Sequence, residues 1–205
     1  GYYMPVQYEG VKAEHQTVRT AVGVFDVSHM GEIFVKGAEA EDFLQYITSN
    51  DISQLSPGKI QYSCMPNGKG GIVDDLLVYK LAESSYLLVV NASNLDKDWA
   101  WLNENNKWDC ELTNSSDKYS LLAVQGPKSI ALLQELTDVD LSAIKYYNFK
   151  IGSIAGIDEV ILSRTGYTGE IGFELYVKNE STKQLWEAIF TTSVELKPIG
   201  LAARD

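Results

Sequence analysis

The sequence has few histidines and few cysteines. Only His15 and His29 are present, so neither a histidine-rich metal site nor a paired His–Cys catalytic arrangement has enough side chains to form. Cys64 and Cys110 lie far apart and lack metal-ligand spacing, a pattern typical of reduced thiols in a reducing compartment. We therefore expect no metal.

Basic residues and long apolar runs are also scarce. There are 17 Lys and Arg against 28 Asp and Glu, which gives a formal net charge of −11 and disfavours nucleic acids and anionic membrane surfaces as partners. No apolar run approaches the roughly 20 residues that cross a bilayer, and the first residues lack a basic-then-apolar signal pattern. With 45% hydrophobic and 22% charged residues, the composition is that of a globular protein.

Two weak internal repeats indicate a duplicated architecture. Residues 35–48 align with 124–137 at an offset of 89, and the strand-like runs at 88–90 and 175–177 lead to Trp99 and Trp186 at an offset of 87. In each half, the aligned segment contains apolar residues at helical spacing, and strand-like runs of β-branched residues come later in the half. The sequence predicts an α+β fold of two split β-α-β (ferredoxin-like) repeats with mostly antiparallel sheets.

Turn residues define the local elements. Pro66–Gly71 contains an Asn-Gly pair and predicts a hairpin between residues 60–65 and 72–81. Asn94 is expected to cap a helix without a capping box, because Lys97 rather than an acid stands three residues later.

Two acids in a strand-like apolar run, Asp74 and Asp75, are the first chemical candidates. Neighbours in a strand point to opposite faces, so one carboxylate is expected on the apolar side with Val73 and Leu77, and only one of the two can be the buried acid. A desolvated carboxylate needs hydrogen bonds or a function. The alternative is a polar strand start after Gly70-Gly71.

A glycine-rich segment, residues 163–176, is the second candidate. Gly166, Gly169 and Gly172 permit a tight turn or the close approach of a flat ligand to the backbone. Glu170 and Glu174 lie in this segment, and an ordinary Gly-rich hairpin is the alternative interpretation. Arg204 stands in a small apolar run and needs a partner for its permanent charge, which an ion pair with the adjacent Asp205 could supply.

Five motifs in this order resemble the T-protein of the glycine cleavage system, a tetrahydrofolate-dependent aminomethyltransferase. The resemblance runs from Tyr2 to Asp205, and the motifs are Asp26-Val27-Ser28-His29-Met30, Gly70-Gly71-Ile72-Val73-Asp74-Asp75, Gln125-Gly126-Pro127, Gly166-Tyr167-Thr168-Gly169-Glu170 and Gly200-Leu201-Ala202-Ala203-Arg204-Asp205.

The resemblance implies a domain organisation. We expect residues 1–34 to form an N-terminal segment packed on the second unit, residues 35–118 a first α+β unit and residues 119–205 a second one, with the folate site between the units. The chain is expected to be truncated at both ends, without the family's C-terminal β-barrel, and to be inactive alone.

The resemblance also assigns roles. Asp75 would be catalytic near the bridging nitrogens of folate, Glu174 would bind the pterin, and Arg204, Tyr167, Met30 and Tyr62 would contact folate or line its cavity. The implied reaction moves the one-carbon unit of an aminomethyl group on the lipoylated H-protein onto tetrahydrofolate, a co-substrate, and releases ammonia. Such a protein would be cytoplasmic in bacteria, or mitochondrial if eukaryotic.

Two alternatives from other classes remain at this point. A related folate-dependent demethylase would share the architecture, although such proteins usually depart from the Gly-Tyr-Thr-Gly-Glu motif kept here. A non-catalytic folate-binding protein is the other alternative, but neither Cys64 nor Cys110 lies in the Cys-containing motif of such regulators.

Overall fold

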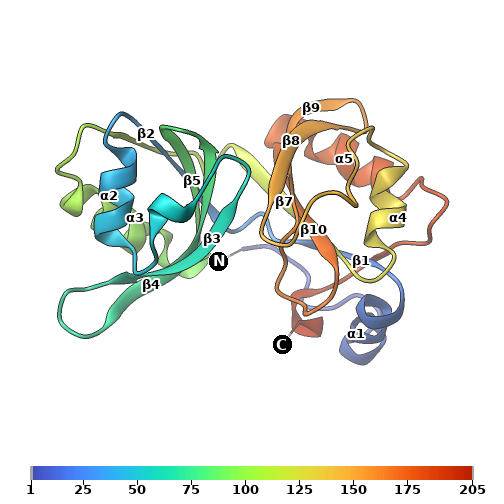
Figure 1. The fold of residues 1–205 in the computed structure, drawn as a ribbon. Coiled ribbons are helices and arrows are strands. Elements are labelled where there is room, and N and C mark those ends of the chain that lie inside the picture. The colour runs from blue at the N-terminus through green and yellow to red at the C-terminus, as the bar shows by residue number, and fades with distance from the viewer. Residues whose placement is uncertain (1, 205) are drawn as a thin grey trace. The chain divides into compact units, whose positions relative to one another are not determined.

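The computed structural model describes residues 2–204, which form two compact units. The central unit comprises residues 29–118. The terminal unit combines residues 2–28 with residues 119–204, so it contains both ends of the described chain (Figure 1).

The central unit is a five-stranded antiparallel sheet with two helices. Its strand order is β3-β4-β5-β2-β6, and every neighbouring pair is antiparallel. The elements in chain order are β2 (Gly31–Lys36), α2 (Ala40–Ile47), β3 (Ile60–Pro66), β4 (Ile72–Ala82), β5 (Ser85–Val90), α3 (Leu95–Asn105) and β6 (Glu111–Asn114).

The terminal unit is a six-stranded sheet in the order β11-β1-β7-β10-β9-β8. All its pairs are antiparallel except the short β1–β11 pair, which is parallel. Its elements are α1 (Val11–Thr20), β1 (Gly23–Asp26), β7 (Tyr119–Gln125), α4 (Ser129–Gln134), β8 (Phe149–Ile154), β9 (Ile157–Ser163), β10 (Gly172–Lys178), α5 (Thr182–Ile189), β11 (Lys197–Pro198) and the 3₁₀ turn η4 (Leu201–Ala203).

The strand order confirms the predicted α+β class. The sheet order β3-β4-β5-β2 of the central unit corresponds to β8-β9-β10-β7 in the terminal unit, with α2 and α4, then α3 and α5, at matching points of the chain. The strand at the next position of the sheet differs between the units. In the central sheet β6 lies beside β2, whereas in the terminal sheet β1, from the start of the chain, lies beside β7.

The boundary expected after residue 34, between an N-terminal segment and the first α+β unit, remains a prediction. In the structure β2 spans that position, and its residues pair with both β5 and β6, so all of β2 lies in the central unit.

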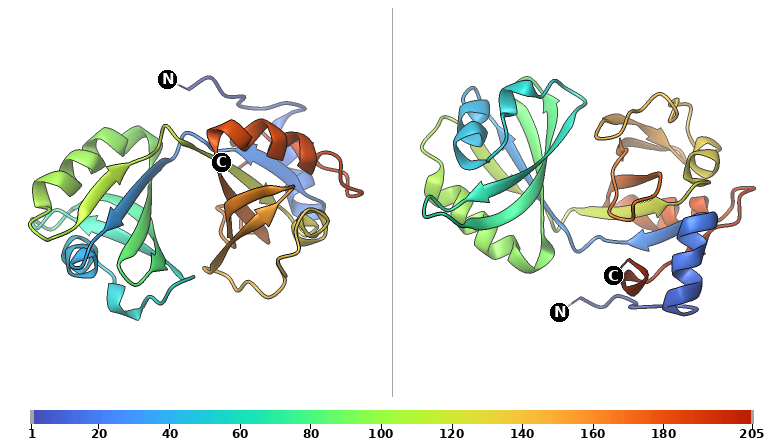
Figure 2. Two further views of the ribbon diagram at one scale, coloured as in Figure 1. Left: turned by 90° about the horizontal axis from the view of Figure 1, so that it is seen from above. Right: turned by 60° about the horizontal axis from the view of Figure 1, so that its bottom comes forward.

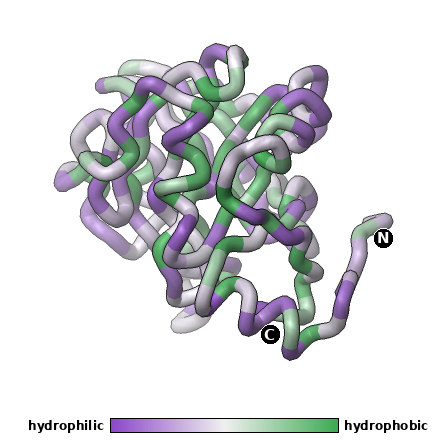
Figure 3. Tube along the Cα trace, turned by 90° about the vertical axis from the view of Figure 1, so that its right-hand side faces the viewer, coloured by the Kyte–Doolittle hydropathy of each residue, from purple (hydrophilic) through white to green (hydrophobic). Residues whose placement is uncertain are grey.

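In each unit two helices cover one face of the sheet (Figures 1 and 2). Apolar residues at alternate strand positions meet the apolar stripes of α2 and α3 in one core, and those of α4 and α5 in the other. The resulting alternation of apolar and polar residues along the chain is visible in Figure 3. The largest completely buried core side chains include Phe43, Ile33 and Leu102 in the central unit and Phe173 in the terminal unit.

The opposite face of the terminal sheet is partly covered by α1 and η4. Val18, Phe25, Ala123, Ile199 and Ala203 pack together there. No helix within residues 2–204 is long and apolar enough to cross a bilayer.

Candidate functional site

Asp74 and Asp75 lie at the start of β4 and point to opposite faces of the central sheet. Asp74 is buried, with 9% of its surface exposed, whereas Asp75 is half-buried. The buried acid of the pair is thus Asp74, on the core side with Leu76 and Val78. The expectation that the buried acid lies on the side of Val73 and Leu77 is wrong, because the core side of β4 carries Asp74, Leu76 and Val78. Val73 also packs against the core, because the register shift between β3 and β4 lies near Pro66.

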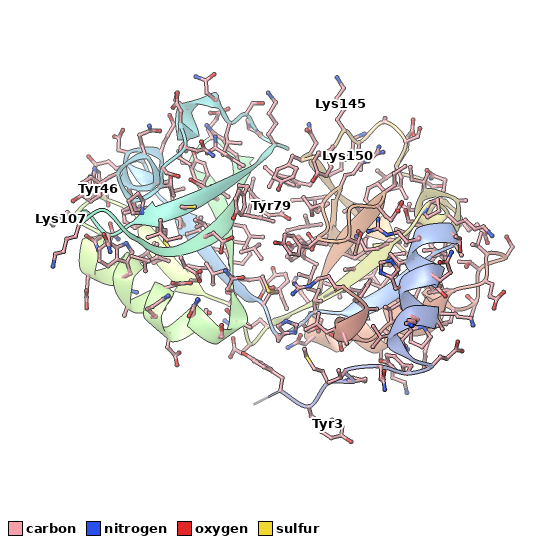
Figure 4. The ribbon with its side chains drawn as sticks, turned by 90° about the horizontal axis from the view of Figure 1, so that it is seen from below. Tyr3, Tyr46, Tyr79, Lys107, Lys145 and Lys150 are labelled. Atoms are coloured by element: carbon pink, nitrogen blue, oxygen red, sulfur yellow. The ribbon has the colours of Figure 1, made fainter. Side chains whose placement is uncertain are left out.

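Asp75 accepts hydrogen bonds from two side chains of neighbouring strands. The hydroxyl of Tyr62, on β3, donates to Oδ2 of Asp75, and Nδ2 of Asn91, just after β5, donates to Oδ1 at 2.6 Å. Tyr62 pairs with Leu77 in the β3–β4 register, so it shares the face of Asp75 that lies away from α2 and α3. Tyr79 on the same strand face is completely buried (Figure 4).

Met30 stands at the edge of this group. It directly precedes β2, where Gly31 pairs with Val90, so it is next to the strand end that carries Asn91. The structure therefore brings Asp75 and Tyr62 together, and Met30 precedes β2 at the same end of the sheet.

Asp74 faces helix α3. Its Oδ2 accepts a hydrogen bond from Nδ2 of Asn94 at 2.9 Å, and its Oδ1 accepts one from Nδ2 of Asn91 at 3.1 Å. Asn94 occupies the N-cap position of α3 as expected, but its side chain caps no helical N–H, because it donates to Asp74.

Glu174 lies in the middle of β10. It pairs with Ala123 of β7 and Ser163 of β9, which places it on the sheet face opposite α4 and α5. Burial raises the pKa of the Glu174 carboxyl, and a hydrogen bond from the Thr165 hydroxyl lowers it in part. The Thr165 hydroxyl is 2.8 Å from that of Ser163, so two hydroxyls line up behind the carboxyl.

Gly166, before β10, and Gly172, its first residue, make room for a side chain of the protein. A Cβ at Gly166 would lie 2.2 Å from Oε1 of Gln125, and one at Gly172 would lie 2.4 Å from the carboxamide carbon of the same residue. Gln125 donates to the carbonyl of Thr165 at 3.2 Å and accepts from the Thr168 hydroxyl at 2.8 Å. The close approach predicted at Gly166 and Gly172 is thus made by Gln125.

Two residues of this segment, Tyr167 and Glu170, interact with arginines from outside it. Glu170 forms an ion pair with Arg19 of α1 at 2.8 Å, which agrees with a turn role. The guanidinium of Arg204 lies 5.1 Å from the ring centroid of Tyr167, a cation–π distance. Tyr167 is 81% exposed, so this pair presents an open aromatic surface.

Several contributing residues were not expected from the sequence. Asn91 and Asn94 end a strand and start a helix, where asparagine is common for local reasons, and nothing in their spacing pointed to Asp74 and Asp75. Thr165 and Gln125 do lie inside or beside recognisable motifs. The signal that could have found Asn91 is its position at the end of the strand next to the Asp-Asp pair.

The geometry defines a two-unit α+β protein with one candidate acid in each sheet, on the face opposite the two helices that cover the core. The family model described as the GCVT N-terminal domain matches residues 1–205, and the chain belongs to that family. The chain is 58% identical over its whole length to proteins named aminomethyltransferase from Flavobacterium psychrophilum and Bacteroides fragilis, and it spans 58% and 57% of their lengths.

A solved structure agrees with this assignment. The glycine cleavage system aminomethyltransferase T from Bartonella henselae superposes with a TM-score of 0.90 at 34% identity, covering 100% of this chain and 56% of that one. A heterotetrameric sarcosine oxidase from a Corynebacterium matches with a TM-score of 0.61 at 18% identity, which shows a shared fold.

Proposed function

We propose that this chain forms part of an aminomethyltransferase of the glycine cleavage system. The reaction would move the one-carbon unit from an aminomethyl-lipoyl carrier, the H-protein, onto tetrahydrofolate and release ammonia. The observation that carries the proposal is the half-buried Asp75 carboxylate, held by Tyr62 and Asn91 in a chain that is 58% identical to aminomethyltransferases.

The chemistry requires orientation and charge stabilisation. The substrate carbon is bonded to both sulfur and nitrogen, and two amine nitrogens of tetrahydrofolate replace both bonds. The C–S and C–N bonds break, two new C–N bonds form, and the two amine protons end on the lipoyl thiol and on ammonia. Holding the amine in line with the carbon supplies much of the rate, and a fixed carboxylate stabilises the cationic centre that develops.

Asp75 is suited to that second task. Its two known donors leave lone pairs on both oxygens, and the Tyr62 hydroxyl and the Asn91 amide fix the direction of the carboxylate. In this role Asp75 stabilises positive charge or accepts a proton from the attacking amine. Met30, next to it, would supply apolar contact to the ligand.

Glu174 is suited to recognise the pterin. A pterin edge carries two adjacent N–H donors, and a carboxylate accepts both. Because burial raises the pKa of Glu174 and only the Thr165 hydroxyl is seen to offset it, two ligand donors would favour the ionised form. Arg204 and Tyr167, stacked on each other, would contact other parts of folate.

An acidic carrier protein would need basic contacts. Lys145, before β8, and Lys150, on β8, are exposed side chains of the terminal unit (Figure 4). We propose that these two lysines contribute to docking of the carrier protein. We also propose that the protein acts in the bacterial cytoplasm, where the H-protein and tetrahydrofolate would be found.

The test uses the full-length protein with aminomethylated carrier and tetrahydrofolate. We expect equimolar methylenetetrahydrofolate, ammonia and free lipoyl thiol, and no methylenetetrahydrofolate when tetrahydrofolate is omitted. The variant Asp158→Asn, which changes an exposed acid of β9, serves as the matched control with unchanged rates. Release of ammonia without transfer of carbon to tetrahydrofolate would contradict the proposal.

A further inference from the structure

Asp98, in the first turn of α3, is a completely buried acid, with 0% of its surface exposed. Neither carboxyl oxygen accepts a hydrogen bond from an N–H or O–H group within residues 2–204. Leaving an ionised carboxylate in such a position is costly, so the group needs either a proton or a ligand.

The group that faces Asp98 is another acid. Asp98 follows Asn94 by about one helical turn, so it lies on the side of α3 from which Asn94 donates to Asp74 at 2.9 Å, and each carboxyl shifts the pKa of the other. Two carboxyls that face each other in a buried site retain a proton between them. Asp74 also accepts from Asn91 and Asn94, whereas Asp98 has no other donor. The proton therefore resides on Asp98, which donates to an ionised Asp74.

The charges around the pair agree with this assignment. Burial, and then the hydrogen bond and charge of Asp74, raise the pKa of Asp98 to about 7, and the charge of Asp75 acts in the same direction. Lys97 acts against them, but its ammonium donates to the carbonyl of Val73 at 2.7 Å. For Asp74, burial raises the pKa, but the hydrogen bonds from Asp98 and Asn94 outweigh it and leave the pKa lowered.

Asn91 connects the pair to the candidate catalytic acid. Its Nδ2 donates to Oδ1 of Asp74 at 3.1 Å and to Oδ1 of Asp75 at 2.6 Å. The orientation of one amide group thus depends on Asp74 and determines one of the hydrogen bonds to Asp75. A change in the charge of Asp98 would therefore affect Asp75 through two intermediate side chains, those of Asp74 and Asn91.

We propose that protonated Asp98 is a positioning residue: it holds Asp74, and through Asn91 it holds Asp75, so that loss of the Asp98 proton disturbs Asp75. The assignment of transfer to Asp75 rests on the proposed function. The hydrogen-bonded chain from Asp98 to Asp75 does not, so the two can be tested separately.

The first test is nuclear magnetic resonance of the full-length protein. We expect a carboxyl that titrates near pH 7 in the wild type and is absent from Asp98→Asn, together with side-chain amide resonances of Asn91 that shift over the same pH range. Loss of the Asn91 shift in Asp98→Asn would support the proposal. Asn91 side-chain amide resonances that do not shift with pH in the wild type would overturn the proposal, whatever the activity assay shows.

The second test compares two substitutions in turnover. Asp98→Asn keeps a donor toward Asp74 but cannot ionise, so kcat should stay near that of the wild type and lose its decline above neutral pH. Asp98→Leu removes the donor, and kcat should fall about tenfold or more with little change in KM for tetrahydrofolate. Asp96→Asn, an exposed acid on the same helix, is the control.

If Asp98→Asn and Asp98→Leu had the same kcat and both retained the alkaline decline of kcat, this result would contradict the positioning role. If Asp98→Leu does not fold, the pH profile of Asp98→Asn and the resonance titration decide the matter. If instead Asp75→Asn retains normal turnover, the proposed catalytic role fails, while the resonance titration still reports on the chain of contacts.

Discussion

Glu14 and Asp98 are both almost completely buried acids, one in each unit, and their surroundings differ in hydrogen-bond donors and in neighbouring charge. Glu14, on α1, accepts hydrogen bonds from the backbone N–H groups of Tyr8, Glu9, Gly10 and Gly200. Asp98 has no N–H or O–H donor within the described residues and faces another acid. Both side chains are at most 2% exposed, so the difference between the two regions is in the number of donors and in the neighbouring acid.

This difference sets the ionisation state of each acid. Burial acts to raise the pKa of Glu14, but the four backbone donors outweigh it and the pKa is lowered. Without such donors, burial raises the pKa of Asp98 to about 7 and that of Glu32, on β2, to about 8. Burial alone therefore does not decide whether an acid in this fold is charged.

Removing the Glu14 carboxylate should have the largest effect on stability. Glu14→Ala leaves the buried N–H of Gly200 and three part-buried N–H groups without an acceptor. A buried group costs about 1–3 kcal/mol and part-buried groups cost less, so we expect a loss on the order of 3 kcal/mol in urea unfolding. Glu9→Ala, which removes only an exposed ion pair with Lys197, is the control and should cost about 1 kcal/mol at most.

The pH dependence sharpens the same prediction. A lowered folded-state pKa means that the contribution of Glu14 is present above its unfolded pKa and is lost as pH falls through the folded value. The gap between the wild type and Glu14→Gln should therefore shrink on acidification. A gap that widens toward low pH would contradict the donor account.

The contribution of Glu32 to stability should depend on pH in the opposite direction to that of Glu14. Its folded pKa of about 8 lies above the ordinary glutamate value of 4.5, so the folded state holds a proton that the unfolded state has released, and stability falls as pH rises between these values. Glu32→Gln should remove a slope of up to about 1.4 kcal/mol per pH unit from the stability curve. An unchanged slope between pH 5 and 8 would show that a donor to Glu32 exists in solution.

Glu174 lies between these extremes, with one hydroxyl donor. Under the proposed function, Glu174→Ala leaves two pterin donors unpaired and should weaken tetrahydrofolate binding to the full-length protein by about tenfold or more. Titration calorimetry measures this, with Glu170→Ala, which lies in the same segment, as the comparison. Equal affinities for the wild type and Glu174→Ala would remove Glu174 from the binding site.

The smallest effect is expected at the Arg19–Glu170 ion pair. Arg19 is 42% exposed in its side chain, and exposed pairs contribute about 0–1 kcal/mol. Arg19→Ala should therefore change the free energy of unfolding by less than about 1 kcal/mol, and less still at high salt. A larger loss would mean that this pair holds the glycine-rich segment in place.

The repeated architecture could be predicted because it depends on local patterns. The offsets of 89 and 87 correspond to β2 with β7 and to α3 with α5, since each repeat needs the same alternation of apolar residues to cover its sheet. The use of β1 in the place of β6 could not be predicted, because a four-residue strand has no distinctive periodicity and its pairing with β7 joins segments about 100 residues apart.

The candidate site was predictable at its motif residues and not at their partners. Asp75 and Glu174 stand in distinctive segments, and Arg204 with Tyr167 came from the same resemblance. Asn91 and Asp98 reach Asp75 only through tertiary contacts, and Asp98 alone looks like an ordinary acid in the first turns of a helix. The role of the glycines near Gln125 also depends on a contact over about 40 residues that no local rule contains.

The most direct test of the account is Asp75→Asn in the full-length protein, measured for both turnover and tetrahydrofolate affinity. Asparagine keeps the size of the side chain and its hydrogen bond from Tyr62 but removes the negative charge, so we expect kcat to fall by at least a hundredfold while the Kd for tetrahydrofolate changes less than threefold. Turnover close to that of the wild type would contradict the central claim that the Asp75 carboxylate carries the transfer step.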